Sequence, residues 1–353
     1  MKLSNQVTDS ENRIEIPMSV PMPPLEIAIL DVGHGNCSIV YDGQAHMIVD
    51  VAQELTALAD LQQMQCTDIG NLVLSHADAD HIRGAAALLA HPDIRVGNLW
   101  VNPDPTKISE LFLDLMYAAQ DYHSEGRLGV FTNLNVGANP SLSAGRVGVE
   151  IVHPGIAYAI SGQSNAKRPQ GSISSNGMSA VLRVSLDGER AVLLPGDLDD
   201  KGLTAILDSG RDISAPVLVF PHHGGRSGAS DEAEFARRLC MAVRPRLVIF
   251  SHGRNVFRNP RVDIVAGIAS SGVEVQLVCT QLSKACHALE ERLIPGHLLN
   301  RPAKGKPSGS CCAGSIVIRL IDGEIVWEPS IDGHSKFVDL IESPLCRRMM
   351  SEK

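Results

Sequence analysis

Aromatic side chains are scarce in this sequence of 353 residues. Trp, Tyr and Phe together make up 4% of it, which leaves little for a platform on which the bases of a single strand would stack. Basic residues are also in deficit, because 31 Lys and Arg face 40 Asp and Glu and the formal net charge is −9. This deficit argues against a general nucleic-acid-binding surface.

Long apolar runs are absent as well. No stretch of about 18 uninterrupted apolar residues occurs, so we expect no transmembrane helix. Residues 1–24 mix charged residues with prolines and lack the apolar core of a signal peptide. Eight cysteines are too few for a disulfide scaffold in a chain of this length. We therefore expect a cytoplasmic protein with reduced thiols.

The chain does contain a dense cluster of metal-ligand side chains. Residues 75–81 read Ser-His-Ala-Asp-Ala-Asp-His and directly follow an apolar, strand-like run. His76 and Asp78 leave an extended backbone on the same side, and Asp80 with His81 can turn toward a second point nearby. Imidazole plus carboxylate suits Zn²⁺, Mn²⁺ or Fe rather than Ca²⁺. Two adjacent metals would make this a hydrolytic site of the two-metal kind.

Apolar strands alternate with amphipathic helices along the chain. Strands are predicted at 25–30, 37–41, 45–51, 72–75, 98–101, 147–152, 180–186, 190–194, 217–220, 247–250, 273–278, 315–320 and 324–327, and helices at 54–65, 82–90, 108–123, 232–241 and 262–270. Residues 155–177 and 298–312, rich in Gly and Ser, are predicted to be mobile loops. Periodicity alone predicts a mixed α/β fold.

The loop at 75–81 resembles the metallo-β-lactamase superfamily signature His-x-His-x-Asp-His, with Asp78 at the second histidine. That variant is similar to the branch containing the hydrolase domain of the ComEC competence proteins. Stretches resembling further elements of the branch follow in order at 30–36, 48–50, 194–197, 221–225 and 251–255. The resemblance implies an αββα sandwich over residues 25–330, with an N-terminal tail at 1–24 and a C-terminal tail at 331–353.

The resemblance also implies two divalent metal ions, Zn²⁺ or Mn²⁺. The expected metal ligands are His76, Asp78, Asp80, His81, Asp197 and His222. We expect the first two on one metal and the next two on the other, with Asp197 as the bridge. The sequence does not decide between His222 and His223 as ligand, and the other histidine would act on the substrate. Asp80, His223 and His252 form the expected catalytic set, with a site-lining role as the alternative for His252.

Other polar residues are expected around these ligands. They are Asp31, His34, Asp50, Asn176, Ser179, Arg226, Arg254 and Asn255. Asp50 would orient a ligand histidine, and Asp31 would either do likewise or cap a turn. The stretch with Asn176 stands where the superfamily usually has a ligand histidine, which leaves the first metal poorer in ligands. A metal role or a structural role is open for His153 nearby.

Arginines gather near the expected cleft and bear on the substrate. Arg244, Arg246, Arg254, Arg258 and Arg261 fall within 18 residues. Beside a two-metal site they suit a phosphate ester, although pairing with neighbouring acids is an alternative for the first two. The first hypothesis is therefore a phosphodiesterase or nuclease acting on DNA or a nucleotide. A hydrolase of a small ester, thioester or lactone and a silent binding or regulatory module are the alternatives, and a separately encoded partner protein stays open.

A second candidate metal site lies in the C-terminal third. Cys279, Cys286, His287, Cys311 and Cys312 fall within 34 residues. Their spacing is not a standard Cys-x-x-Cys pair. A structural metal site and packed thiols both fit this pattern.

Overall fold

Two β-sheets pack face to face in the computed structural model, which describes residues 24–137, 142–161, 173–254, 257–288 and 293–347. The first sheet has the strand order β14-β13-β1-β2-β3-β4-β5-β6, and the second has the order β12-β11-β10-β9-β8-β7. The strands are β1 (Glu26–Ile29), β2 (Ser38–Asp42), β3 (Gln44–Val49), β4 (Asp68–Leu74), β5 (Arg95–Val101), β6 (Gly129–Phe131), β7 (Val147–His153), β8 (Val181–Leu186), β9 (Glu189–Leu194), β10 (Val217–Val219), β11 (Leu247–Phe250), β12 (Gln276–Cys279), β13 (Ile316–Ile321) and β14 (Glu324–Glu328). Each strand predicted from the sequence overlaps one of these, and β6 is additional.

Apolar side chains on both faces of the strands explain the layering. Ile27 and Ile29 of β1 lie in the core between the two sheets, whereas Ala28 and Leu30 lie in a second core on the outer face. Successive side chains of a strand point to opposite faces, so such a strand must be covered on both sides. Full burial of one aliphatic side chain of this size contributes about 1.5–3 kcal/mol.

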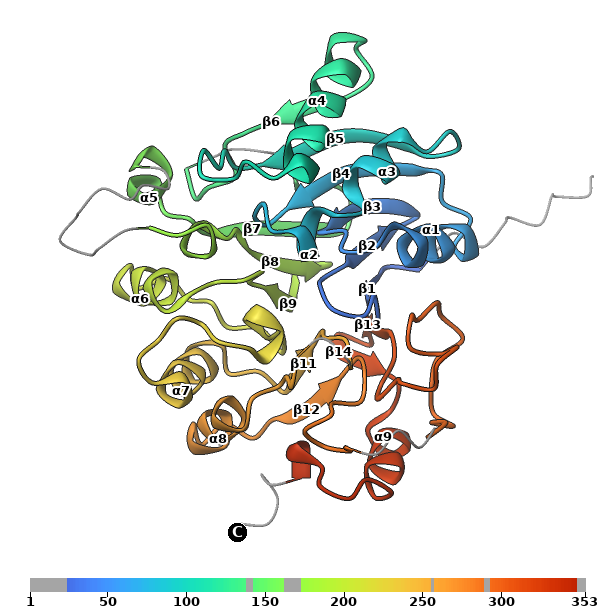
Figure 1. Cartoon of the computed structure of the whole chain (residues 1–353), viewed down its shortest axis with the longest axis vertical. Helices are drawn as coiled ribbons and strands as arrows, with labels where there is room; N and C mark the ends of the chain where they lie inside the picture. The colour runs from blue at the N-terminus through green and yellow to red at the C-terminus, as the bar shows by residue number, and fades with distance from the viewer. Residues whose placement is uncertain (1–23, 138–141, 162–172, 255–256, 289–292, 348–353) are drawn as a thin grey trace, which may run out of the picture.

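Helices cover the outer face of each sheet. The first sheet is covered by α1 (Glu54–Gln63), α2 (Ala79–Ile82), α3 (Ala85–Ala90) and α4 (Glu110–Ser124), and the second by α6 (Asp200–Asp208), α7 (Glu232–Val243), α8 (Val262–Ser270) and α9 (Ile331–Val338). Figure 1 shows α6, α7 and α8 along one side of the molecule, away from α1 and α3. The order helix, sheet, sheet, helix confirms the predicted αββα sandwich.

The parallel strands determine where the candidate ligands meet. β3, β4 and β5 are parallel neighbours in the first sheet, and β9, β10 and β11 are parallel neighbours in the second. The carboxyl ends of parallel strands lie at one edge, which is where ligands bind in sheets of this kind. The two edges touch, because Ala180 N donates to Ser75 O at 2.8 Å and Ser251 Oγ donates to Gly35 O at 2.8 Å.

One predicted helix is divided in two. The sequence predicts a helix over 82–90, but α2 ends at Ile82 and α3 begins at Ala85. The break lies at Gly84, whose N–H donates to Val51 O at 2.7 Å. A Cβ at Gly84 would lie 2.5 Å from Glu54 N, so the close approach to the neighbouring loop requires glycine there. The helices α5 (Ile156–Ser161), α6 and α9 were not predicted from the sequence.

The segments expected as tails and loops differ from one another in the structure. Residues 1–23 and the central part of the expected 155–177 loop, residues 162–172, lie outside the described residues. The loop at 298–312 is held by Asp31, which accepts from Gly305 N at 3.0 Å. In the expected C-terminal tail, Phe337, Ile341 and Leu345 are buried in the core under α7 and α8. Packed structure therefore continues beyond residue 330. Every helix of the described ranges is too short or too polar to cross a bilayer.

Candidate metal centre

The loop after β4 carries the first group of ligand-type side chains. His76 and His81 are buried, and Asp78 and Asp80 are partly exposed. Asp80 and His81 lie within α2, whereas His76 and Asp78 lie in the loop before it. The start of α2 at Ala79 therefore separates the four side chains into two pairs.

Asp197 reaches the same place from the second sheet, in the turn after β9. Its N–H donates to Ser179 Oγ at 3.0 Å, and that hydroxyl donates to Pro195 O at 3.3 Å. The preceding Gly196 has a φ of +55°, and a Cβ there would lie 2.3 Å from Ser179 Oγ. A glycine and a small hydroxyl residue are thus required for the turn that directs Asp197 inward.

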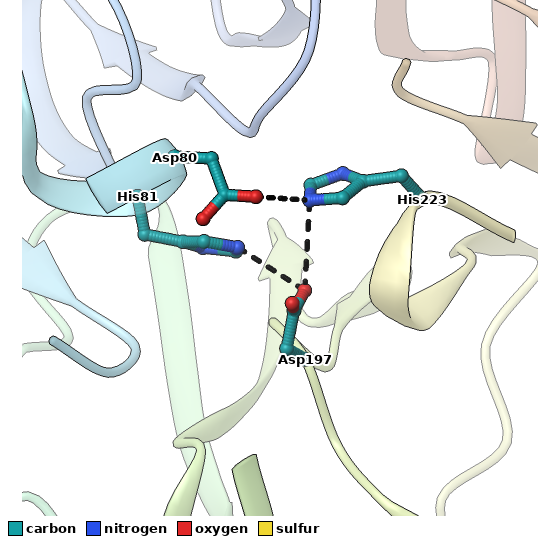
Figure 2. A group of neighbouring side chains, drawn as sticks. All are labelled: Asp80, His81, Asp197 and His223. Atoms are coloured by element: carbon teal, nitrogen blue, oxygen red, sulfur yellow. Dashed lines mark ion pairs between the residues drawn. The ribbon is translucent and has the colours of Figure 1, made fainter. Parts of the chain in front are cut away.

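Asp80, His81, Asp197 and His223 form a compact group, called here the second half-site. One ligand atom from each lies within 4.8 Å of all the others. His81 Nε2 lies 3.1 Å from Asp197 Oδ1, and His223 Nε2 lies 3.4 Å from Asp80 Oδ2. Figure 2 shows the four side chains converging on one point, with His223 opposite the pair Asp80 and His81.

The other oxygen of Asp197 faces a second group, called here the first half-site. It comprises His76, Asp78 and His222. His222 Nδ1 lies 3.3 Å from Asp197 Oδ2, and His76 Nε2 lies 3.9 Å from the same oxygen and 3.8 Å from Asp78 Oδ2. The two oxygens of the Asp197 carboxylate thus face different sets of ligand-type atoms.

Lys107 adds a cation to the first half-site. Its ammonium forms an ion pair with Asp78 Oδ1. Lys107 lies in the loop after β5, the parallel neighbour of β4. One carboxylate of the first half-site is therefore already neutralised by the protein itself.

The two adjacent histidines after β10 contribute to both half-sites. His222 and His223 have φ values of 52° and 57°, in the left-handed region that residues other than glycine rarely adopt. This pair of conformations directs His222 Nδ1 to Asp197 and His223 Nε2 to Asp80. His223 Nδ1 lies 2.8 Å from Ser251 O, which fixes its ring. Unfavourable backbone conformations of this kind cluster at functional sites.

Several buried polar atoms of the centre lack hydrogen-bond partners among the described residues. They are Nε2 of His76, His81 and His223 and Oδ1 of Asp197. Leaving one buried polar atom unpaired costs about 1–3 kcal/mol, so four such atoms facing one another need a partner. Imidazole nitrogen and carboxylate oxygen are ligands of Zn²⁺ and similar ions. The donor set therefore fits divalent metal ions.

The charges of the centre are strongly coupled. Burial would lower the pKa of His81, but the carboxylates of Asp197 and Asp50 raise it well above its ordinary value. Burial would raise the pKa of Asp197, but His81, His222 and His223 hold it well below the usual range. Burial and the neighbouring His81 lower the pKa of His76 to about 4. Without metal the centre thus holds an ionised Asp197, a neutral His76 and a cationic His81, and a metal ion bound to His81 would have to displace that proton.

Asp50 supports the ligands from behind. Its Oδ2 accepts from Ser75 Oγ at 2.9 Å and lies 2.7 Å from His81 Nδ1. Its Oδ1 accepts from Ser75 N at 2.8 Å. A carboxylate on the far nitrogen of a ligand histidine fixes the tautomer and orientation of the ring. The structure thus places Asp50 on the ring of His81, on the side away from Asp197.

A cleft of about 440 Å³ opens over the second half-site. Its lining includes Asp80, His223, His34, Phe257, Arg226 and Arg258. His34 Nε2 lies 3.3 Å from Asp80 Oδ2, and its ring meets Phe257 edge-on at 4.9 Å. Phe257 is 58% exposed, and Arg226 and Arg258 are exposed as well. The centre therefore opens into a space with cationic groups and one exposed aromatic ring.

The structure places other predicted site residues away from the ligands. Asp31 binds backbone N–H groups of Gly33 and Gly305, so it holds two loops together rather than facing a metal. Arg254 donates to the carbonyls of Leu282 and His287 instead of lining the cleft. His252 is 1% exposed and is not among the residues that line the cleft.

The remaining predicted residues include Asn176, which stands where the superfamily usually has a ligand histidine, and several residues elsewhere. The backbone carbonyl of Asn176 accepts a hydrogen bond from Ser179 N at 3.1 Å. His153 Nε2 lies 2.8 Å from Gly177 O, which gives this buried ring a structural role. Of the arginines further along, Arg244 lies near Asp212, and Arg246 donates to Ile325 O, so neither belongs to the cleft. Asn255 lies outside the described residues.

Two residues at the centre were missed from the sequence. Lys107 follows β5 at the same sheet edge as the metal loop, so the rule that sites gather at strand ends could have found it. Phe257 had no local signal, since a single Phe in a loop is more often a packing residue. Its exposure beside His34 is visible only in the folded chain.

Comparison with known proteins agrees with this geometry. The family profile described as the metallo-beta-lactamase superfamily matches residues 30–252. Competence protein ComA of Neisseria gonorrhoeae is 26% identical over 275 residues, which are 76% of this chain and 33% of that protein. Recombination protein 2 of Haemophilus influenzae is 23% identical over 252 residues, which are 69% of this chain and 26% of that protein. The chain thus spans about a third or less of these relatives.

Solved structures give a coarser likeness. Igni18, a metallo hydrolase from Ignicoccus hospitalis, matches with a TM-score of 0.43 at 16% identity, covering 71% of this chain and 94% of that one. The metallo-beta-lactamase fold protein YhfI from Bacillus subtilis matches with a TM-score of 0.41 at 11% identity, covering 72% and 96%. The profile match extends over more than half of the chain and over the loops that form the centre. The chain belongs to the metallo-β-lactamase superfamily.

Proposed function

We propose that this chain is a metal-dependent phosphodiesterase that acts on DNA or a nucleotide. The observation that carries the proposal is the Asp197 carboxylate, whose two oxygens face two sets of imidazole and carboxylate groups. Two metals held about 3.5–4 Å apart are typical of phosphatases and nucleases. The second half-site opens into a cleft with exposed arginines, which suits an anionic ester.

Each half-site would hold one divalent ion. His76, Asp78 and His222 would hold the first, Asp80, His81 and His223 would hold the second, and Asp197 would lie between them. This assigns both histidines of the pair to metals, in place of the catalytic role expected for His223. Bound Zn²⁺ or Mn²⁺ would supply Lewis-acid chemistry and a water nucleophile at neutral pH. Asp80, beside both His34 and His223, would be the carboxylate closest to the substrate.

The cleft residues would bind the substrate. Arg226 and Arg258 are exposed at its wall and would contact phosphate oxygens. Arg261 also lines the cleft, but its guanidinium donates to the Asp263 carboxylate, which partly neutralises its charge. His34 lines the cleft with its Nε2 on Asp80 and would keep that carboxylate in place beside the ester. An exposed phenyl ring such as Phe257 offers a face on which one base can stack.

The names of two relatives favour DNA or a nucleotide, and the cleft has room for a small phosphate ester. The relatives ComA and Recombination protein 2 are named for competence and recombination. A cleft of about 440 Å³ is of the size that holds a small ligand. The net charge of −9 makes binding depend on this local group of arginines rather than on the whole surface.

The test is hydrolysis by the full chain with Mn²⁺ or Zn²⁺ added. Substrates would be single- and double-stranded DNA, bis(p-nitrophenyl) phosphate and, for the alternative, p-nitrophenyl acetate and a lactone. Asp80→Ala removes one ligand, and Asp68→Ala, at an exposed pair with Arg95, serves as the matched control. We expect metal-dependent phosphodiester cleavage that is lost in the first variant and kept in the second. Metal-dependent hydrolysis of the carboxylic esters alone would contradict the proposal.

A further inference from the structure

A positively charged segment lies in the C-terminal third of the chain. Its described residues, 279–288 and 293–315, include Lys284, Arg301, Lys304 and Lys306 but no Asp or Glu. The whole chain, by contrast, has a formal net charge of −9. A local excess of positive charge on an acidic protein attracts anions to that part of the surface.

The buried side of this segment does not form the second metal site that the sequence left open. Among the described residues, the second half-site is the only group of three or more candidate ligands close enough to share an ion. Cys311 Sγ lies 3.3 Å from Asp31 Oδ2. The neighbouring Cys312 Sγ lies 3.3 Å from His334 Nε2 instead. The two thiols therefore pack separately, and the exposed part of the segment is what a ligand could meet.

Backbone contacts fix Lys304 beside the loop that follows β1. Lys304 N donates to Asp31 O at 2.8 Å, and Gly305 N donates to Asp31 Oδ2 at 3.0 Å. Ser315 joins the same two segments, because its Oγ accepts from Asp31 N at 2.9 Å and donates to Pro302 O at 2.5 Å. Asp31 is fully buried, so these contacts are shielded from water. Lys304 therefore has a fixed place relative to the loop after β1.

The side chain of Lys304 lies along Gly33 of that loop. A Cβ at Gly33 would be 3.0 Å from Cδ of Lys304 and 3.5 Å from its Nζ. Gly33 also has a φ of +81°, so glycine serves both the turn and the close approach of the lysine. The next residue, His34, lines the cleft and has its Nε2 3.3 Å from Asp80 Oδ2. Lys304 is not part of the lining, so its ammonium lies outside the cleft on the side of His34.

The charge of Lys304 is available to a ligand. Its side chain is exposed, and no carboxylate of the described residues forms an ion pair with it. The same holds for Arg226 and Arg258 in the cleft lining. Lys306 donates to two backbone carbonyls rather than to a carboxylate, so its charge is held in place without being neutralised. Cationic groups are therefore present both within the cleft and outside it.

We infer that Lys304 is a substrate-positioning residue that binds a phosphate of a DNA strand next to the one cleaved at the metal centre. This inference rests on the proposed function. Phosphates repeat along a strand, so a strand with its scissile phosphate at the metals presents further phosphates to the surface outside the cleft. An ammonium on a flexible stem binds a phosphate as a point charge and carries no sequence information. The substrate would then be an oligonucleotide, because an ester with a single phosphate group lacks this contact.

The test compares a substrate that has one phosphate group with one that has many. The full chain with Mn²⁺ would be assayed on bis(p-nitrophenyl) phosphate and on a single-stranded DNA oligonucleotide. In Lys304→Ala, we expect the KM for the oligonucleotide to rise about 1.5–5-fold, the effect of losing one exposed ion pair. Its kcat and the hydrolysis of the small diester should not change. Lys304→Arg should restore the parent KM, and Lys336→Ala, at an exposed lysine of α9, is the matched control.

Binding without turnover gives a second readout. Fluorescence anisotropy of a labelled oligonucleotide, measured with a chelator present, would give the Kd at several salt concentrations. One phosphate contact on a single strand contributes about 0.7 to the slope of log Kd against log salt concentration. The slope should therefore be smaller by about that amount in Lys304→Ala and should keep its parent value in Lys304→Arg and Lys336→Ala.

The outcomes separate this inference from the proposed function. A parent that hydrolyses neither phosphodiester would contradict the proposed function, and the salt slope would still decide whether Lys304 binds a strand. An unchanged KM and slope in Lys304→Ala would overturn the inference. So would an equal rise of the KM for the small diester, or a parent chain that does not bind the oligonucleotide.

Discussion

Nδ1 of His81 lies 2.7 Å from Oδ2 of Asp50, on the opposite side of the ring from Asp197. Both residues are buried. The contact leaves His81 Nε2 as the atom that faces the second half-site and prevents the ring from turning away. The orientation of His81 at the candidate metal centre is therefore fixed by Asp50, a residue that does not line the cleft.

Replacing Asp50 by Asn should weaken metal binding at the second half-site by about 10–100-fold, the usual effect of removing a carboxylate behind a ligand histidine. Titration of the metal-free protein with Mn²⁺ or Zn²⁺ against a chromophoric chelator would measure it. Asp60→Asn is the matched control, because Asp60 is also buried but binds Tyr41 and Arg301 away from the centre. An unchanged affinity in Asp50→Asn would show that the contact does not support the ligand.

Replacing Lys107 by Met should increase the metal affinity of the first half-site. The ammonium of Lys107 neutralises Asp78, so a divalent ion must displace it to use that carboxylate. At a free metal concentration that fills only the tighter half-site of the parent, we expect metal analysis to give close to one ion per Asp197 centre in the parent and close to two in the variant. Lys336→Met, on the exposed side of α9, is the control. Equal occupancy in parent and variant would mean that Lys107 does not compete with a metal.

Replacing Phe257 by Ala should raise the KM for a nucleotide or single-stranded substrate with little change in kcat. Stacking of one base on an aromatic ring contributes about 1–3 kcal/mol, which corresponds to about 5–150-fold in KM. A small diester without a base should be hydrolysed equally well by both proteins. Phe131→Ala, at a ring that stacks on Trp100 at the far edge of the first sheet, is the control. A matching KM increase for the small diester would contradict a base-stacking role.

The metal-free protein should lose stability as the pH falls below about 6.5. Burial lowers the pKa of His252 from 6.5 to about 3, so between these values the unfolded chain binds a proton that the folded chain does not. Each such proton changes the free energy of unfolding by about 1.4 kcal/mol per pH unit. The free energy of unfolding, measured with urea, should decrease less steeply below pH 6.5 in His252→Asn than in the parent. Part of the decrease should remain, because the pKa of His334 is also lowered, to about 4. Identical slopes would show that His252 is not buried in its neutral form.

Much of the fold and part of the centre could be predicted from the sequence. The apolar strands and the spacing of His76, Asp78, Asp80 and His81 are local features, and they carried the resemblance to the superfamily. The split of His222 and His223 between the two half-sites could not be predicted, because it depends on two left-handed backbone conformations. The division of the helix at Gly84 depends on a close approach to Val51 and Glu54, which are distant in sequence.

Long-range partners account for the other differences. Arg254 was expected at the substrate, but two carbonyls about 30 residues away bind its guanidinium. Cys346 lines one cavity with Cys279, Cys286 and Cys312 only because α9 and the residues after it fold back onto the second sheet. Composition gave no sign of either contact, since each depends on where a distant segment packs.

The most direct test of the central claim is anomalous diffraction from crystals soaked in Mn²⁺. The geometry predicts peaks on both sides of the Asp197 carboxylate, roughly 3.5–4 Å apart. The stronger peak should lie among Asp80, His81 and His223, and the weaker one beside Asp78 and Lys107. Peaks only at other places on the chain, or none at saturating metal, would contradict a metal centre built around Asp197.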